Sequence, residues 1–187
     1  MPDTADYGPH ETEAVEPLPQ ALHGTLSVEE YLNTSYSPDR EYLDGLVLER
    51  NVGDKDHSLL QASLAHYFRR RRKQWNIEVY TELRVQIRPN WYPIPDVCVY
   101  MLPDFEGPYP SQPPVLWIEI LSPSDTAREV WRKTQDLLAG GVPRVWIIDP
   151  RTLAGELHTL GGIQRVGAVL AISDTPIEIT LSDIMTE

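Results

Sequence analysis

The sequence is poor in cysteine and contains no long apolar segment. Its 187 residues include one cysteine, Cys98, so no disulfide can form within the chain, as is usual in reducing compartments. The longest apolar runs, such as 115–121, and shorter ones such as 145–148, are far below the roughly 20 residues of a membrane-spanning helix. The start of the chain also lacks a signal-peptide pattern. We therefore expect a cytoplasmic protein without a membrane partner, in which Cys98 is a buried small hydrophobe rather than a nucleophile.

Positive charge is also scarce. The chain has 16 Lys and Arg residues against 28 Asp and Glu residues, a formal net charge of -12, which is unlike a protein that coats nucleic acid. Any contact with nucleic acid must then be local. Residues 1–24 are acidic and proline-rich, with no Lys or Arg and few large apolar residues. We expect a disordered acidic tail over 1–24 that adds no stability, followed by one domain over 25–187.

Several common catalytic and binding motifs are missing. The sequence contains no HExxH, no paired CxxC, no phosphate-binding Walker loop and no GxSxG. Its late glycines, Gly155, Gly161 and Gly162, do not form a dinucleotide fingerprint. Any chemistry must therefore come from residues that are dispersed along the chain.

The first half predicts short strands around one long helix. Ser27 and Glu30 have the spacing of a capping box, and Asp44-Gly45 is a strong hairpin signal within 41–48. Leu60, Leu64 and Phe68 recur at helical spacing. The predicted elements are a helix after Ser27, a helix from Asp54 or Asp56 to about Lys73, and strands at 77–83, at 85–88 and from Asp96.

The second half predicts a strand, a helix and a strand. The run 115–121 is apolar enough to be a central strand buried on both faces, and 144–149 reads as another buried strand. Between them, Val130, Leu137 and Leu138 form the inner stripe of a helix over 126–139, which Gly140-Gly141 ends. This order predicts a parallel strand pair in an α/β fold. Residues 103–114 are a proline-rich loop, and the late glycines mark β-hairpins.

Two carboxylates lie within or at the start of predicted strands. Glu119 lies inside the apolar central strand, where an ionised carboxylate is costly unless it is paired or bound to metal. Asp96 follows Pro93-Ile94-Pro95 and opens a strand. Carboxylates at neighbouring strand ends would form a hard oxygen site suited to Mg²⁺ or Mn²⁺. The alternatives are a structural salt bridge for Glu119 and a turn-capping role for Asp96.

Lys133 is the candidate cation. With Val130 at the centre of the apolar stripe, Lys133 falls roughly 60° to one side, on the border of the buried face. Its long stem could reach over the sheet, or it could be a surface lysine paired with Glu129. Arg132 falls roughly 160° from Val130, and Arg128 lies on the same far side, so both should face solvent.

Three other features have ordinary explanations as well as functional ones. Glu41 precedes the Asp44-Gly45 turn, where exposed glutamate is common. His57 begins a helix, where a neutral or capping role is usual. The basic run 69–73 ends the same helix, where cations interact favourably with the helix dipole, although it could also contact phosphate.

The order of these segments resembles the Uma2 family, also called DUF820. The matching segments are SVEEYL, REYLDGLVLE, the histidine-led helix at His57, IPDVCVY and LWIEILSPSDTAREVWRKTQDLLAGGVPRVWIIDP. They span about residues 25–150. The resemblance implies a restriction-endonuclease-like fold of the PD-(D/E)XK superfamily, with a mixed central sheet, flanking helices and extra β-hairpins.

The resemblance also implies roles for residues. Asp96 and Glu119 would be metal ligands, with the backbone carbonyl of Ile120 as a further ligand, and Lys133 would be the catalytic lysine. Glu41 would be an additional acidic residue of the site. The sequence departs from the parent motif at one position, because Leu121 stands where the ExK motif places its lysine. In this family the lysine is displaced to the following helix.

Two functions follow. One is an endonuclease that depends on Mg²⁺ or Mn²⁺ and hydrolyses phosphodiester bonds of nucleic acid, with DNA as the first candidate and RNA as the alternative. Because cleavage of a duplex needs two sites, such an enzyme could act as a homodimer. The other is a catalytically silent, nuclease-like binding or assembly module. The acidic charge favours the second function, and the complete set of Asp96, Glu119 and Lys133 favours the first.

Overall fold

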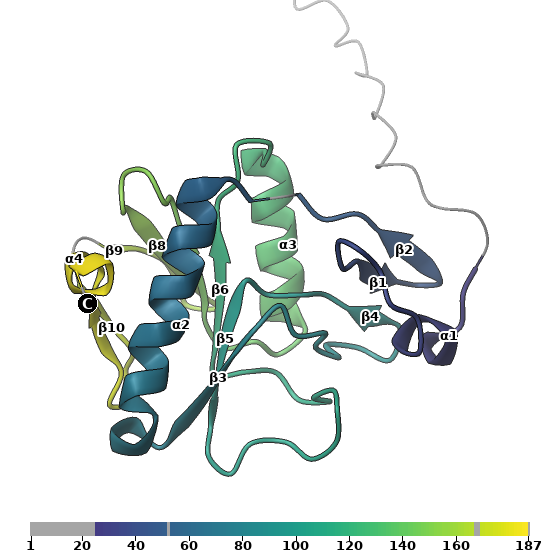
Figure 1. Ribbon diagram of the computed structural model, residues 1–187, viewed down its shortest axis with the longest axis horizontal. Helices are drawn as coiled ribbons and strands as arrows, with labels where there is room; N and C mark the ends of the chain where they lie inside the picture. Colours follow the sequence, from purple (N-terminus) through teal and green to yellow (C-terminus); the bar gives the residue numbers. More distant parts are fainter. Residues whose placement is uncertain (1–24, 52, 167–168, 187) are drawn as a thin grey trace, which may run out of the picture.

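The computed structural model describes residues 25–51, 53–166 and 169–186 (Figure 1). The acidic tail predicted over 1–24 lies outside the described residues. Within the described ranges, no helix is long and apolar enough to cross a membrane.

A six-stranded mixed sheet forms the centre of the domain. Its strand order is β3-β5-β6-β7-β8-β9. The strands are β3 (Ile77–Thr81), β5 (Val97–Met101), β6 (Leu116–Ile120), β7 (Val145–Ile148), β8 (Gly155–Thr159) and β9 (Gly162–Val166). β6 and β7 are parallel, as the sequence predicted, and the other neighbours are antiparallel. β6, which carries Glu119, is therefore an inner strand.

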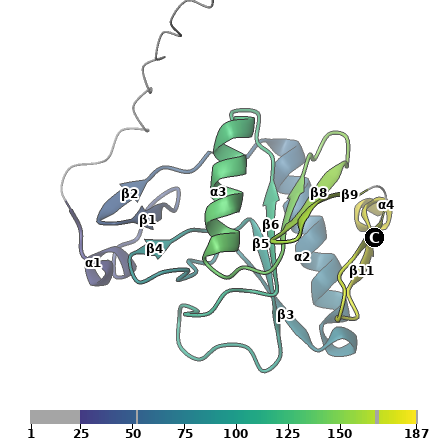
Figure 2. The same cartoon turned by 180° about the vertical axis from the view of Figure 1, so that it is seen from behind.

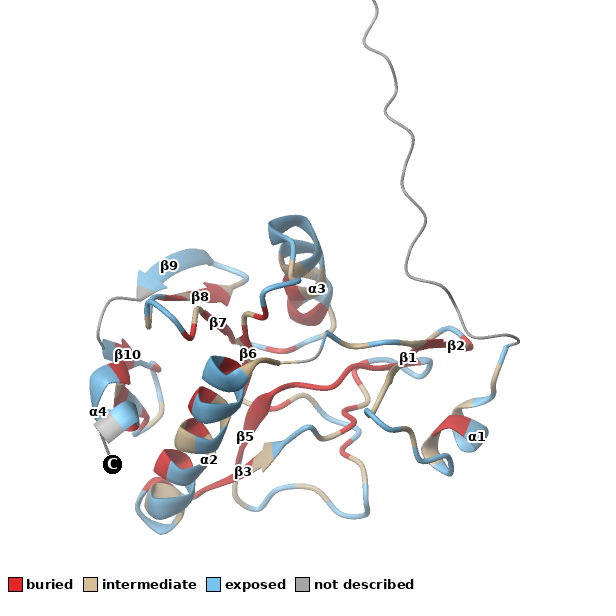
Figure 3. Ribbon diagram, turned by 45° about the horizontal axis from the view of Figure 1, so that its top comes forward, coloured by how far each residue is buried: buried red, intermediate tan, exposed pale blue. Residues whose placement is uncertain are grey.

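One long helix covers each face of this sheet. In Figures 1 and 2, α2 (Lys55–Trp75) and α3 (Ala127–Ala139) lie on opposite sides of the strands. The apolar side of α2 packs on one core and that of α3 on a second core, which contains Trp117 of β6. Figure 3 shows that β5 is buried along most of its length. The two periodic helices and the apolar strands were predicted correctly because burial dictates their patterns.

The helix boundaries follow from their caps. The side chain of Asp54 accepts the backbone N–H of His57, and Thr126 forms a capping box with Glu129. α2 ends where Asn76 adopts a left-handed conformation, with φ of 53°. Both caps matter for the site, since they fix where His57 and Lys133 enter it.

A small second sheet flanks the central one. It has the order β2-β1-β4, formed by β1 (Glu41–Leu43), β2 (Leu46–Leu48) and β4 (Trp91–Tyr92), with α1 (Val28–Leu32) beside it. β1 and β2 form the predicted hairpin, in which Asp44 and Gly45 both have positive φ. A third core of tyrosines, including Tyr31 and Tyr42, holds α1 against this sheet. The small sheet presents Glu41 to the rest of the domain.

Three expectations for the strands and helices need correction. The predicted strand 85–88 is an extended loop, in which Val85 and Gln86 donate their N–H groups to the carbonyls of Pro93 and Pro110. Only Arg88 forms an isolated bridge to a strand, at Trp91 of β4. The strand predicted over 77–83 ends at Thr81, because Glu82 adopts a left-handed conformation. The late region holds the predicted hairpins, β8–β9 and the pair β10 (Val169–Ala171) and β11 (Glu178–Thr180), but it also contains the unpredicted helix α4 (Leu181–Thr186).

Candidate active site

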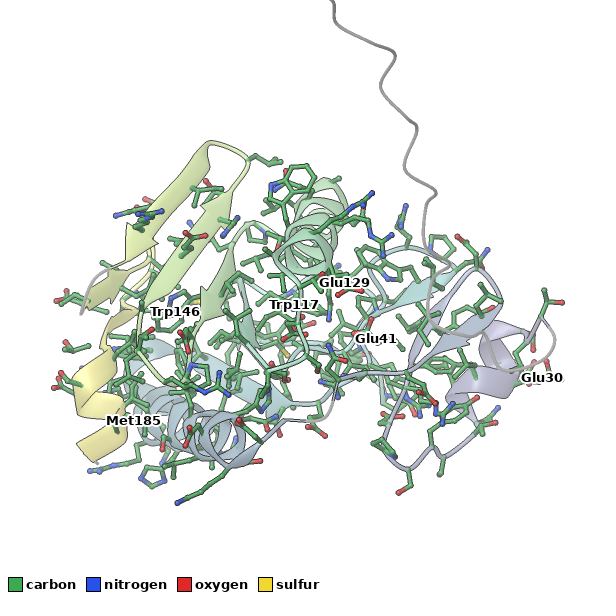
Figure 4. The ribbon with its side chains drawn as sticks, turned by 90° about the horizontal axis from the view of Figure 1, so that it is seen from above. Glu30, Glu41, Trp117, Glu129, Trp146 and Met185 are labelled. Atoms are coloured by element: carbon green, nitrogen blue, oxygen red, sulfur yellow. The ribbon has the colours of Figure 1, made fainter. Side chains whose placement is uncertain are left out.

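A cleft of about 240 Å³ lies where the small sheet, the end of β6, the start of α2 and one side of α3 meet. All four side chains predicted for the site, Glu41, Asp96, Glu119 and Lys133, line it. Figure 4 shows Glu41 of the small sheet near Glu129 of α3, across this cleft. The fold thus brings together residues that are dispersed over more than ninety positions of the chain.

Lys133 lies at the centre of the group. Its ammonium Nζ is 2.8 Å from Oε1 of Glu119 and 2.8 Å from Oε1 of Glu41. The side chain is 29% exposed, as a residue at the border of the buried face should be. Burial opposes its charge, but Glu119 and Glu41 outweigh that effect and raise the pKa of Lys133. The predicted alternative, a pair with Glu129, does not form, because Glu129 is engaged in the capping box.

Glu119 has an unusual protonation equilibrium. Burial raises its pKa to about 7, with the negative charges of Asp96 and Glu41 adding to the effect and Lys133 only partly opposing it. The indole N–H of Trp117, two residues earlier on the same face of β6, donates to Glu119 Oε1 over 2.7 Å. The carboxyl group is therefore held in a fixed orientation and is poised to gain or lose its proton near neutral pH.

Asp96 is held in its charged form. Its Oδ2 accepts the backbone N–H of Ile120 at 2.7 Å and lies 3.2 Å from His57 Nε2, and its Oδ1 lies 3.2 Å from the guanidinium of Arg50. Burial favours the neutral acid, but His57, the Ile120 amide and Arg50 outweigh it and lower the pKa of Asp96. Burial likewise opposes the charge of His57, and Asp96 outweighs it, so the pKa of His57 is raised.

His57 was expected to have only a neutral or capping role, and Arg50 and Trp117 were not predicted as members of this cluster. The position of His57 was predictable, since it shares the helical spacing of Leu60 and Leu64 and therefore belongs to the buried face of α2. Trp117 precedes Glu119 by two residues, and side chains two residues apart in a strand point to the same face. Its place beside Glu119 was therefore also predictable. Arg50 lies in the segment between β2 and α2, and no periodic signal marks it.

The basic run at 69–73 does not belong to the site. It lies at the opposite end of α2 from His57. Arg69 and Arg72 contact the carboxylate of Glu78, and the guanidinium of Arg71 stacks 3.5 Å from the ring centroid of Tyr67. Much of this run is therefore engaged in contacts within the protein.

The donor set is compatible with Mg²⁺. Among the described residues, no three His, Cys, Asp or Glu side chains are grouped at the spacing of a metal cluster. Mg²⁺ is commonly held by one or two carboxylates, with water and substrate phosphate completing its shell. Asp96 and Glu119 border one cleft and supply two such carboxylates. The Ile120 N–H points to Asp96, and the N–H and C=O of a strand residue point the same way, so the Ile120 carbonyl lies on that side as well.

The mixed sheet between two helices, with carboxylates and a lysine gathered at the end of β6, defines the class as a restriction-endonuclease-like nuclease fold. The chain belongs to the Uma2 family, whose model, described as "Putative restriction endonuclease", matches residues 28–183. The fold is similar to the crystal structure of a "putative nuclease belonging to DUF820" from Anabaena variabilis ATCC 29413. That match has a TM-score of 0.72 and 20% identity, and it covers 86% of this chain and 98% of the other. A search of curated proteins found no significant match.

Proposed function

We propose that the chain is a divalent-metal-dependent endonuclease that hydrolyses phosphodiester bonds of DNA. The observation that carries the proposal is the position of Lys133, whose ammonium contacts Glu119 and Glu41 in the cleft that Asp96 also lines. Two carboxylates and a cation in one cleft are the groups that phosphodiester hydrolysis requires. Membership of a nuclease family supports the same conclusion.

Asp96 and Glu119, with the carbonyl of Ile120, would hold Mg²⁺ or Mn²⁺. The bound ion would polarise the phosphodiester and lower the pKa of a coordinated water. Asp96 is suited to this role because it is already ionised at neutral pH. Glu119 must lose its proton, which its pKa of about 7 allows near neutrality. Arg50 and His57 fix the orientation of the Asp96 carboxylate before any ion arrives.

Lys133 would act directly on the reacting atoms. An ammonium has three N–H donors, and Glu41 and Glu119 accept two of them. The third N–H can orient the attacking water or stabilise the charge on a phosphate oxygen. In the reaction, the water oxygen bonds to phosphorus, and the bond from phosphorus to the oxygen of the leaving sugar breaks. Glu41 accepts both Lys133 and the backbone N–H of Ile94, and so holds the ammonium in place.

Calorimetric titration with Mn²⁺ tests the proposed site. Asp96→Asn keeps the shape of the side chain and removes its charge. It should lower the free energy of unfolding less than a truncation of Asp96, which would leave Arg50 and His57 without a polar partner. Glu178→Gln, at an exposed position on β11, is the matched control. We expect Mn²⁺ affinity to be lost in Asp96→Asn and kept in Glu178→Gln. If the unmodified chain binds no Mn²⁺, the catalytically silent module becomes the better explanation.

A further inference from the structure

The cations that line the cleft fall into two groups. Arg50 and Lys133 lie inside it, and each contacts a carboxylate. Arg88 and Arg132 also line the cleft but are exposed at its rim. Neither rim arginine has a carboxylate oxygen within 4.0 Å among the parts of the chain that the structure describes. In a chain of net charge -12, exposed arginines that form no ion pair mark a place where an anion can bind.

Arg88 is held in place without being neutralised. It lies in the turn that leads into β4, where Ile87 and Arg88 donate their backbone N–H groups to the carbonyl of Trp91. Its guanidinium lies 4.7 Å from the ring centroid of Trp91, which is buried. Such stacking restricts the side chain and leaves the N–H donors of the planar guanidinium free to bind two oxygens of a phosphate.

Arg132 stands on the other wall of the cleft. It precedes Lys133 in α3, and a step of one residue turns the helix by about 100°, so Lys133 enters the cleft while Arg132 stays at its rim. Glu129, one turn earlier, has its carboxylate bonded to the Thr126 cap, and the pKa of Glu129 is lowered mainly by these hydrogen bonds and to a smaller extent by the charge of Arg132. Glu129 and Arg132, both among the described residues, form no ion pair within 4.0 Å, so the guanidinium can still bind a phosphate. The expectation that Arg132 faces solvent is correct, but the residue also borders the cleft. Arg128 is also exposed and does not border the cleft.

We infer that Arg88 and Arg132 bind the two phosphates that flank the scissile phosphate, one from each wall of the cleft. This inference rests on the proposed function and makes it more specific. The substrate would be an internal phosphodiester in a continuous strand, which carries phosphates on both sides of the cleaved bond. The contacts are to the backbone, so they would position the strand without reading its bases.

The test is the salt dependence of DNA binding. A fluorescein-labelled duplex of about 20 base pairs is titrated with the full chain, with Ca²⁺ as the divalent ion and a gel to show that the probe stays intact. The variants are Arg88→Ala and Arg132→Ala, with Arg128→Ala as the control on the same helix. Each lost phosphate contact should reduce the slope of log K against log salt concentration by about 0.9. The loss should be the same for two unrelated duplex sequences.

Conservative variants separate this role from a folding defect. Arg88→Lys and Arg132→Lys keep the charge and should restore most of the slope, while all variants should melt within a few degrees of the unmodified chain. If the unmodified chain binds DNA and both alanine variants keep its slope, the inference is wrong and the proposed function stands. If the unmodified chain does not bind DNA at all, the proposed function and the inference both fail.

Discussion

The ammonium of Lys133 lies 2.8 Å from the carboxylate of Glu119, although the two residues belong to different elements, α3 and β6. Leu121 occupies the position two residues after the glutamate, where the parent motif has its lysine. The helix that follows β6 delivers the cation to the cleft instead. The charge is thus present beside Glu119 even though the strand does not carry it.

Replacing Lys133 should separate catalysis from metal binding. Lys133→Met keeps the apolar stem and removes the charge. We expect DNA cleavage to fall on the order of 100-fold or more, because the cation acts on the charge that develops during reaction. Mn²⁺ affinity should not weaken, since Lys133 competes for Glu119. Plasmid nicking and calorimetry measure the two effects, with Arg128→Met as the control. Wild-type cleavage by Lys133→Met would exclude its catalytic role.

The raised pKa of Glu119 predicts a dependence of stability on pH. Its pKa is raised from 4.5 to about 7, so its contribution to the free energy of unfolding is complete below pH 4.5 and is lost as the pH rises through 7. Glu119→Gln has no group that titrates there. As the pH rises from about 5 to about 8, the difference in the free energy of unfolding between this variant and the unmodified chain should therefore shift in favour of the variant. The shift should amount to up to about 3 kcal/mol.

Urea unfolding with EDTA at several pH values measures that gain. Glu178→Gln, at an exposed position, should follow the unmodified chain at every pH. Parallel stability curves for Glu119→Gln and the unmodified chain would mean that Glu119 is ionised throughout the range, paired with Lys133.

Arg84 should be among the residues most important for stability. Its side chain is 7% exposed and donates to Asp39 and to the backbone carbonyls of Tyr31 and Thr34. Arg84→Met leaves these acceptors without their donor, which should lower the free energy of unfolding by about 3 kcal/mol. The exposed Arg128→Met should change it by less than about 0.5 kcal/mol. A loss below about 1 kcal/mol for Arg84→Met, measured by urea unfolding, would contradict this account.

The regular part of the fold was accessible from the sequence because burial leaves a periodic trace. The stripe of Leu60, Leu64 and Phe68 predicted α2, and the apolar run around Glu119 predicted β6. The sequence predicts a strand over 85–88, but the segment is a loop. The alternation of apolar and polar residues indicates which side chains are buried, and it does not indicate which groups accept the backbone N–H. The two-residue strand β4 is too short to leave a pattern.

For the site, the sequence indicated candidates but not their contacts. The helical position of Lys133 predicted that it lies at the border of the core, and a costly carboxylate in a buried strand singled out Glu119. Nothing local in the sequence predicted that Arg50 contacts Asp96, or that Glu41 contacts Lys133. Those pairs depend on how the small sheet packs beside the central one, which is a long-range property of the fold.

Cleavage of supercoiled plasmid DNA is the most direct test of the central claim. The full chain is incubated with Mg²⁺ or Mn²⁺, beside Asp96→Asn and Glu119→Gln prepared in the same way and beside Glu178→Gln as the control. We predict nicked or linear product from the unmodified chain and from Glu178→Gln, none with EDTA, and none from the two site variants. No product from the unmodified chain, or equal product from Asp96→Asn and Glu119→Gln, would contradict the claim that this cleft hydrolyses DNA.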